Sequence, residues 1–160
     1  MRVAVYPGSF DPITYGHMDI VKRALKVFDK LIILISANPT KNSLFTPEER
    51  VDMVKVALKP CIDKVDVFIS NELSVKETKR LGATHMIRGL RAMTDFEYEF
   101  QLTHTNRVLE KDIDSVFFMT DNKYSFLSST TVKEIALFKG ELGPFVPEYV
   151  EQKIKEKLNY

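Results

Sequence analysis

Residues 7–17 read Pro-Gly-Ser-Phe-Asp-Pro-Ile-Thr-Tyr-Gly-His, and this stretch decides how the chain begins to fold. The apolar run 3–6 precedes it, and an amphipathic run follows over residues 18–28. This order predicts a strand, a loop with two glycines and a helix that opens on Thr-x-Gly-His. A helix N-terminus carries unpaired N–H groups and a partial positive charge, so it is a natural site for phosphate. The sequence therefore predicts an anion site directly after the first strand.

Short apolar runs, many of them β-branched, recur along the whole chain. They occupy residues 3–6, 31–36, 65–69, 85–88 and 115–119. Such runs suit strands that are buried on both faces of a parallel sheet. Because helical patterns lie between them, we predict a doubly wound α/β fold with a five-stranded parallel sheet.

The helical patterns have recognisable starts. Thr46-Pro47-Glu48-Glu49 combines a capping hydroxyl, a proline at the first helical position and a glutamate that completes a capping box. The same logic predicts caps at Ser74 and Thr94, and the helix after Thr94 is expected to run to about Lys111. A last helix is predicted to begin near Pro147.

The composition limits the class of protein. Of 160 residues, 44% are hydrophobic and 28% charged, and the net charge of +1 gives no sign of a basic nucleic-acid surface. The single cysteine, Cys61, excludes an internal disulfide. No apolar stretch approaches the roughly 18 residues of a membrane span, and no signal peptide is recognisable. We expect one cytoplasmic domain over residues 1–160, with neither nucleic acid nor a membrane as a partner.

Polar motifs follow several of the predicted strands. In a doubly wound sheet, ligands bind beyond the carboxyl ends of the strands, so these motifs are expected to converge. Neither the dinucleotide pattern G-x-G-x-x-G nor a P-loop is present, which removes the main support for an NAD-dependent oxidoreductase or a P-loop kinase. A flavoprotein-like electron carrier of similar topology has no supporting motif either.

Each candidate residue has a plainer alternative. Thr14 is either a helix cap or part of the phosphate site, and His17 either faces solvent or donates to phosphate. Lys41 either clamps an anionic group or is an ordinary exposed lysine. Arg88 and Arg91 carry planar forks suited to phosphate oxygens, or else they pair with buried carboxylates.

Two further features stay open on the same terms. Glu99 could pair with an arginine, bind ribose hydroxyls or face water. The run 128–131 holds four successive hydroxyl residues before a helical pattern, which either cradle phosphates or over-specify a cap. The histidines His17, His85 and His104 lack the spacing of zinc ligands. A magnesium ion held mostly by phosphates and water would leave little trace in the sequence.

Together these motifs resemble the phosphopantetheine adenylyltransferases, a bacterial family of coenzyme A biosynthesis within the T/H-x-G-H nucleotidyltransferases. The segments that carry the resemblance are 6–17, 45–50, 87–92, 95–99 and 124–129. The resemblance implies a Rossmann-like fold and transfer of the adenylyl group of ATP to 4′-phosphopantetheine with Mg²⁺, which yields dephospho-coenzyme A and pyrophosphate.

The resemblance also implies roles for individual residues. His17, Lys41 and Arg91 would stabilise the transition state, and the acceptor phosphopantetheine would contact Ser9, Lys41, Ser74 and Arg88. The implied ATP site comprises Ser9, Phe10, His17, Gly89, Leu90, Arg91, Glu99, Tyr124, Ser125, Phe126, Leu127, Ser128, Ser129 and Thr130. Ser74 departs from the family, whose members often carry an apolar residue there, and residues 59–72 align poorly.

The resemblance further implies a cytoplasmic homohexamer, with coenzyme A as a feedback ligand in some members. A phosphate nucleophile needs no strong general base, so the reaction is expected to be a direct in-line displacement. A sister enzyme acting on nicotinamide mononucleotide or glycerol phosphate is the nearest rival. A non-catalytic nucleotide-binding regulator is a rival from another class.

Overall fold

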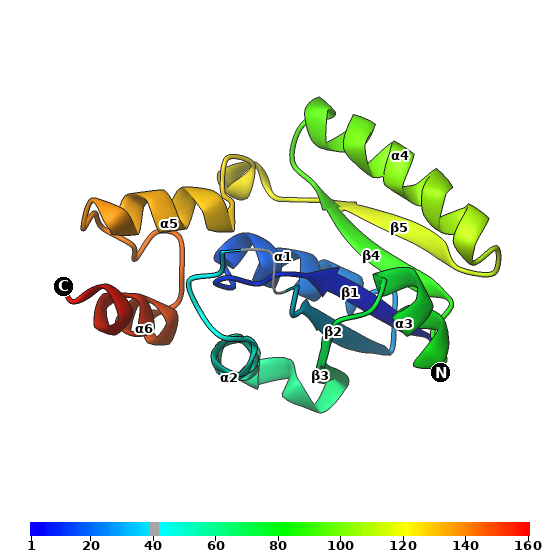
Figure 1. Cartoon of the computed structure of the whole chain (residues 1–160), viewed down its shortest axis with the longest axis horizontal. Helices are drawn as coiled ribbons and strands as arrows, with labels where there is room; N and C mark the ends of the chain where they lie inside the picture. The colour runs from blue at the N-terminus through cyan, green and yellow to red at the C-terminus, as the bar shows by residue number, and fades with distance from the viewer. Residues whose placement is uncertain (39–41) are drawn as a thin grey trace.

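Five parallel strands form the centre of the computed structural model, which describes residues 1–38 and 42–160 (Figure 1). The order across the sheet is β3-β2-β1-β4-β5. The strands are β1 (Val3–Gly8), β2 (Lys30–Ser36), β3 (Val65–Ser70), β4 (His85–Leu90) and β5 (Asp114–Met119). All five predicted strands are confirmed, and so is their parallel pairing.

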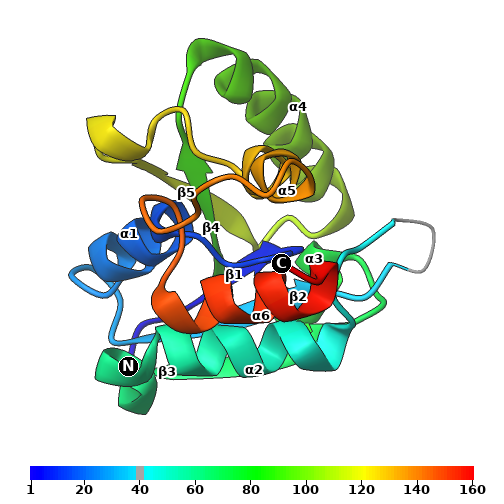
Figure 2. The same cartoon turned by 90° about the vertical axis from the view of Figure 1, so that its left-hand side faces the viewer.

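Helices connect the strands and close the C-terminal end of the fold. They are α1 (Tyr15–Ala24), α2 (Pro47–Ala57), α3 (Ser74–Arg80), α4 (Met93–Leu109), α5 (Ser129–Leu137) and α6 (Glu148–Leu158), with short 3₁₀ turns η1 (Lys59–Lys64) and η2 (Asn122–Tyr124). Figure 2 shows α6 lying along α2, an arrangement that contacts between the two helices support. Among the described helices, none has the length and apolar character that crossing a membrane requires.

The strand order creates a crevice at the middle of the sheet. The chain leaves β1 for β2 on one side, and after β3 it returns to β4 on the other side of β1. The connections that follow β1 and β4 therefore diverge in opposite directions. In open α/β sheets this switch point is where ligands bind.

Side chains alternate between two cores, as the period of a strand requires. Ala4 and Tyr6 belong to the main core, to which α1, α2, α5 and α6 contribute. Val5 between them points to the opposite face, where it packs with Ile32 and Leu34. Burial on both faces explains why the sequence of β1 is continuously apolar.

The predicted helix boundaries are partly wrong. The capping box at Thr46 is present as expected, but α3 begins on Ser74, with Leu73 at the cap position. The next predicted cap, Thr94, lies inside α4, which begins one residue earlier, whereas its end at Leu109 agrees with the predicted end near Lys111. The hydroxyl in these two helices stands one or two residues inside the first turn, where propensity alone does not distinguish it from a cap.

Candidate active site

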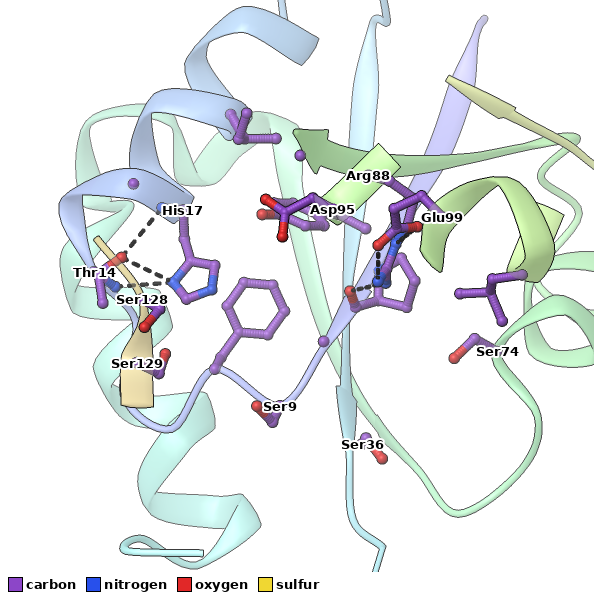
Figure 3. A pocket seen from close by; sticks show the side chains of 18 of the residues that line it. Ser9, Thr14, His17, Ser36, Ser74, Arg88, Asp95, Glu99, Ser128 and Ser129 are labelled. Carbon is purple, nitrogen blue, oxygen red and sulfur yellow. Dashed lines mark hydrogen bonds and ion pairs between the residues drawn. The ribbon is translucent and has the colours of Figure 1, made fainter. Parts of the chain in front are cut away.

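A cavity of about 820 Å³ opens at the carboxyl ends of the strands, over the switch point. Figure 3 shows polar side chains on two sides of the cavity, with Ser9, Ser36 and Asp95 between them. Thr14, His17, Ser128 and Ser129 form one group. The other group consists of Arg88, Glu99 and Ser74. The strands and helix termini thus bring together residues from the first 10 positions to residue 130 of the chain.

His17 serves as part of a helix cap and also lines the cavity. Thr14 caps α1, and its main-chain N–H donates to Nδ1 of His17 at 3.0 Å. Burial, together with the nearby Arg91, lowers the pKa of His17 from 6.5 to about 4. The imidazole is therefore neutral at physiological pH. Because Nδ1 accepts a hydrogen bond, the proton resides on Nε2, and His17 presents an N–H donor on its remaining nitrogen.

The N-terminus of α5 reaches the same side of the cavity. Ser128 caps the helix, since its hydroxyl accepts from the main-chain N–H of Thr131 at 3.1 Å. The Ser129 hydroxyl donates to the carbonyl of Pro12 at 2.8 Å, which ties α5 to the loop after β1. The first N–H groups of a helix lack intrahelical partners, so α5 offers an anion site beside that of α1.

Phe10 lies beside His17 and has an unusual backbone conformation. Its φ is 47°, in the left-handed region that bulky residues rarely adopt. Its ring is buried and lies 4.8 Å from the imidazole of His17 and 5.2 Å from the ring of Tyr6, between centroids. Such conformations persist where the surroundings fix them, and they are common at functional sites.

Arg88 is held by a carboxylate at the other side of the cavity. Its Nε and Nη2 donate to the two carboxylate oxygens of Glu99 at 2.8 and 2.7 Å, and its Nη1 donates to the carbonyl of Pro7 at 3.4 Å (Figure 3). Burial lowers the pKa of Arg88, but the pair with Glu99 outweighs this effect and raises it. Glu99 is buried, so of its three open alternatives the structure has it paired with an arginine.

Arg91 links α4 to the segment before α5. Its guanidinium donates to Asp95 at 3.2 and 3.4 Å and to the carbonyl of Leu127 at 3.1 Å. The carboxylate of Asp95 also accepts from the main-chain N–H groups of Arg91 and Ala92. Arg91 is thereby fixed next to His17, whose pKa it helps to lower.

The charge of the described cavity lining does not favour an anion by itself. Its charged side chains are two arginines and three carboxylates, and Asp95 and Glu99 are already bound to arginines. Within residues 1–38 and 42–160, no group of three or more His, Cys, Asp or Glu side chains is placed to hold a metal ion.

Most of the residues predicted for the site meet in this cavity. Those that line it are Ser9, Phe10, His17, Ser74, Arg88, Gly89, Arg91, Glu99, Leu127, Ser128, Ser129 and Thr130. Lys41 lies outside the described residues.

Four other predicted residues do not line the cavity: Leu90, Tyr124, Ser125 and Phe126. Leu90 ends β4, and its carbonyl accepts from the N–H of Thr120. The remaining three lie in or just after η2, where Tyr124 stacks against Tyr15 outside the cavity and Phe126 is exposed. The turn at η2 carries them away before the chain returns at Leu127.

Several lining residues escaped the sequence reasoning. Asn71, Glu72 and Leu73 follow β3, and Tyr98 and Leu102 lie on α4. The end of the third strand was a usable signal, because it reaches the same sheet edge as the others. For Tyr98 the 95–99 motif was a usable signal, whereas Leu102 has none, because only the packing of the helix turns it toward the cavity.

The fold is shared with a crystal structure of a bifunctional NMN adenylyltransferase/ADP ribose pyrophosphatase from Francisella tularensis, complexed with AMP and a manganese ion. The TM-score is 0.67 at 15% sequence identity, over 91% of this chain and 44% of that one. This likeness supports the Rossmann-like fold.

Sequence comparison reaches closer relatives. The cytidylyltransferase-like family model matches residues 5–135. The phosphopantetheine adenylyltransferase of Carboxydothermus hydrogenoformans is 52% identical over 160 residues, covering 99% of this chain and 97% of the relative. The enzyme of the same name from Desulforamulus reducens is 51% identical over 162 residues, covering 100% and 99%. With this identity over its whole length, the chain belongs to the phosphopantetheine adenylyltransferase family of cytidylyltransferase-like proteins.

Proposed function

We propose that this protein transfers the adenylyl group of ATP to 4′-phosphopantetheine, giving dephospho-coenzyme A and pyrophosphate. The observation that carries the proposal is the two-sided cavity in a chain about half identical to enzymes of that name. The side with two helix N-termini and His17 suits a triphosphate. The side with Arg88 offers a cation for a phosphate, and Leu73 and Leu102 add apolar surface to the cavity lining for an uncharged arm.

The proposed reaction is a single in-line displacement. An oxygen of the acceptor phosphate forms a bond to the α-phosphorus of ATP, and the bond from that phosphorus to the bridging oxygen breaks. The electron pair leaves with pyrophosphate. The nucleophile is already anionic near neutral pH, so the protein supplies alignment and stabilisation of charge.

His17 is proposed to act as a neutral hydrogen-bond donor. Its low pKa and the hydrogen bond at Nδ1 support a fixed N–H on Nε2. A donor fixed in advance loses no free energy to reorientation as charge develops on the phosphoryl oxygens. Arg91 is proposed to add positive charge on the same side, and Lys41 is proposed to contribute in the same way.

Magnesium is proposed to accompany ATP. When bound, it would neutralise charge on the phosphates and withdraw electrons from the phosphorus under attack. The carboxylates of the described lining are largely engaged by arginines, so the proposed ligands of the ion are phosphate oxygens and water.

The family membership also suggests an oligomeric state and a cellular location for the protein. We propose that residues 1–160 act as one nucleotidyltransferase domain within a cytoplasmic homohexamer, with coenzyme A as a candidate feedback ligand. Supporting the assembly, α4 carries a run of exposed apolar side chains. They are Met93, Phe96, Phe100, Val108 and Leu109. Exposed apolar patches of this kind mark contact surfaces between proteins.

The deciding experiment is a pyrophosphate-release assay with Mg²⁺ and ATP. We expect turnover with 4′-phosphopantetheine and none above background with nicotinamide mononucleotide or glycerol phosphate. The His17→Ala variant, prepared in parallel, controls for contaminating activity. Turnover with another acceptor only would replace the proposed substrate, and binding of ATP without pyrophosphate release from any acceptor would indicate a regulator.

A further inference from the structure

Arg50 is a buried cation beneath the candidate active site, and neither the fold nor the proposed reaction accounts for it so far. It closes the motif at 45–50, in which Thr46 and Glu49 form the capping box of α2. Only 2% of the surface of Arg50 is exposed. One guanidinium nitrogen, Nη1, donates to the carbonyls of Ser9 at 2.7 Å and Ser36 at 2.9 Å.

The ion pairs of the described chain do not include Arg50. Asp11 and Glu48 act to raise its pKa, but the carboxylate of Asp11 is occupied by Lys133 at 3.1 Å and by two main-chain N–H groups. The Nε atom of Arg50 is buried without a hydrogen-bond partner. Burial lowers the pKa of Arg50, as expected for a charge removed from water. An apolar side chain would pack here without these costs, so packing does not explain the arginine.

The two carbonyls that Arg50 binds belong to residues that line the cavity. Ser36 ends β2, and Ser9 immediately precedes Phe10. Figure 3 shows Ser9 and Ser36 on neighbouring segments of the cavity. Arg50 therefore joins the loop after β1 to the end of β2 at the place where the cavity lies.

The hydrogen bond from Arg50 to the Ser9 carbonyl fixes the orientation of the peptide group between Ser9 and Phe10. A peptide is planar and trans, so the Ser9 carbonyl and the Phe10 N–H point in opposite directions. The carbonyl is turned toward Arg50, and the N–H of Phe10 has no partner among the described residues. The positive φ of Phe10 means that this orientation needs support from its surroundings.

We propose that Arg50 is a positioning residue that holds the Ser9–Phe10 peptide so that the Phe10 N–H donates to the phosphates of bound nucleotide. The inference rests on the proposed function, since it takes the cavity to hold ATP. It assigns to the last residue of the 45–50 motif a task that helix capping does not require.

The test compares binding of the two substrates by Arg50→Met and Arg50→Lys, measured by calorimetry. The Met variant removes the donor and is expected to weaken binding of Mg-ATP by about tenfold or more, the scale of a hydrogen bond to a charged group. Binding of 4′-phosphopantetheine should change by less than about threefold. The Lys variant keeps a cationic donor at similar reach and should recover most of the affinity for ATP.

The controls separate positioning from general stability. Arg107→Met removes an exposed arginine that pairs with Asp114, outside the cavity lining, and should leave both affinities unchanged. Equal losses for both substrates with a lowered thermal midpoint would assign Arg50 a merely structural role and overturn the inference. Should Arg50→Met not fold, Arg50→Gln is judged by the same criteria.

A crystal structure of Arg50→Met shows the orientation of the Ser9–Phe10 peptide directly, whether or not the protein catalyses the proposed reaction. We expect the Ser9 carbonyl to turn and Phe10 to leave positive φ. An unchanged peptide would refute the positioning role even if the wild type turns over. Conversely, a wild type that releases no pyrophosphate would overturn the proposed function. The orientation of the Ser9–Phe10 peptide in the Met variant would still show whether Arg50 positions it.

Discussion

At the scale of single residues, His17 shows how one side chain satisfies two requirements. Its Nδ1 accepts from the N–H of Thr14 and completes the cap of α1, which leaves Nε2 with the proton. The capping interpretation and the phosphate interpretation of Thr-x-Gly-His are thus compatible, because the imidazole has two nitrogens. Capping by one nitrogen orients the other.

Substitutions at His17 should separate these two tasks. We expect His17→Ala to lower kcat by roughly a hundredfold, the scale of losing one oxyanion donor. His17→Asn keeps an acceptor near the position of Nδ1 and should lose a similar fraction of kcat while retaining more stability. Steady-state kinetics and urea unfolding of both variants check this. Full turnover in either variant would remove His17 from its proposed role.

The low pKa of His17 makes stability depend on pH in a defined window. In the unfolded chain, His17 has its ordinary pKa of 6.5 and is protonated below that pH. In the folded protein its pKa is about 4, so the imidazole stays neutral down to about pH 4. Between these values the unfolded state binds more protons, so this residue makes the free energy of unfolding fall as pH decreases from 6.5 to 4. Urea midpoints at several pH values, for wild type and His17→Asn, should show a shallower slope in the variant. Identical slopes would contradict the assigned shift.

Arg88 should affect one substrate more than the other. We expect Arg88→Ala to weaken binding of 4′-phosphopantetheine by about tenfold or more, because a charged donor to its phosphate is lost. Arg88→Lys is the matched control, since it keeps the charge near Glu99 but not the two-pronged geometry. Calorimetry with each substrate measures the difference, and an unchanged affinity for phosphopantetheine would refute the assignment.

At the scale of elements, helix N-termini build the proposed triphosphate site. α1 and α5 lie far apart in sequence, yet the hydroxyl of Ser129 on α5 bonds to Pro12 just before α1. The described cavity lining has more carboxylates than arginines. The oriented N–H groups of the two helices therefore matter more for binding an anion than a count of charged residues indicates.

The cap of α5 offers a test at this scale. Ser128→Ala removes the hydroxyl that accepts from Thr131 and should lower the free energy of unfolding by about 1 kcal/mol. It should also weaken binding of Mg-ATP, because the first turn frays where the phosphates are proposed to lie. Thr105→Ala, on the exposed part of α4, is the control and should leave the binding of Mg-ATP unchanged. A stable, tightly binding Ser128→Ala would count against the role of this helix terminus.

At the scale of the whole molecule, the long helix α4 stands out because much of its apolar surface is exposed. Phe100, with 53% of its surface exposed, packs against the tilted ring of Phe96 and edge-to-face against His104 along one side of the helix. Tyr98 and Glu99 on the same helix line the cavity. An assembly that covers the apolar side would therefore also fix the helix that carries cavity residues.

We expect Phe100→Glu to shift the proposed hexamer toward smaller species, because a charge would be buried in the contact. Light scattering of the purified protein measures the mass directly. Val27→Glu, an exposed apolar position outside α4, is the control and should leave the mass unchanged. An unaltered mass for Phe100→Glu would show that this side of α4 is not the contact.

The sequence by itself determined the parallel sheet and most of its edge. Continuous apolar runs report burial on both faces, and each strand end was predicted within two residues. The rule that strands of one sheet end together predicted where the cavity lies, and the family resemblance supplied most of the individual site residues that line it. These are local signals, readable from residues that are adjacent or one helical turn apart.

Only the tertiary structure decided which polar groups meet. Arg88 pairs with Glu99, and Arg50 binds the carbonyl of Ser9, although these partners are far apart in the sequence. Tyr124 packs against Tyr15 and so lies outside the cavity. No periodicity in the sequence encodes such contacts, because they depend on how helices pack against the sheet. The sequence supplies the donors, and packing fixes their partners and directions.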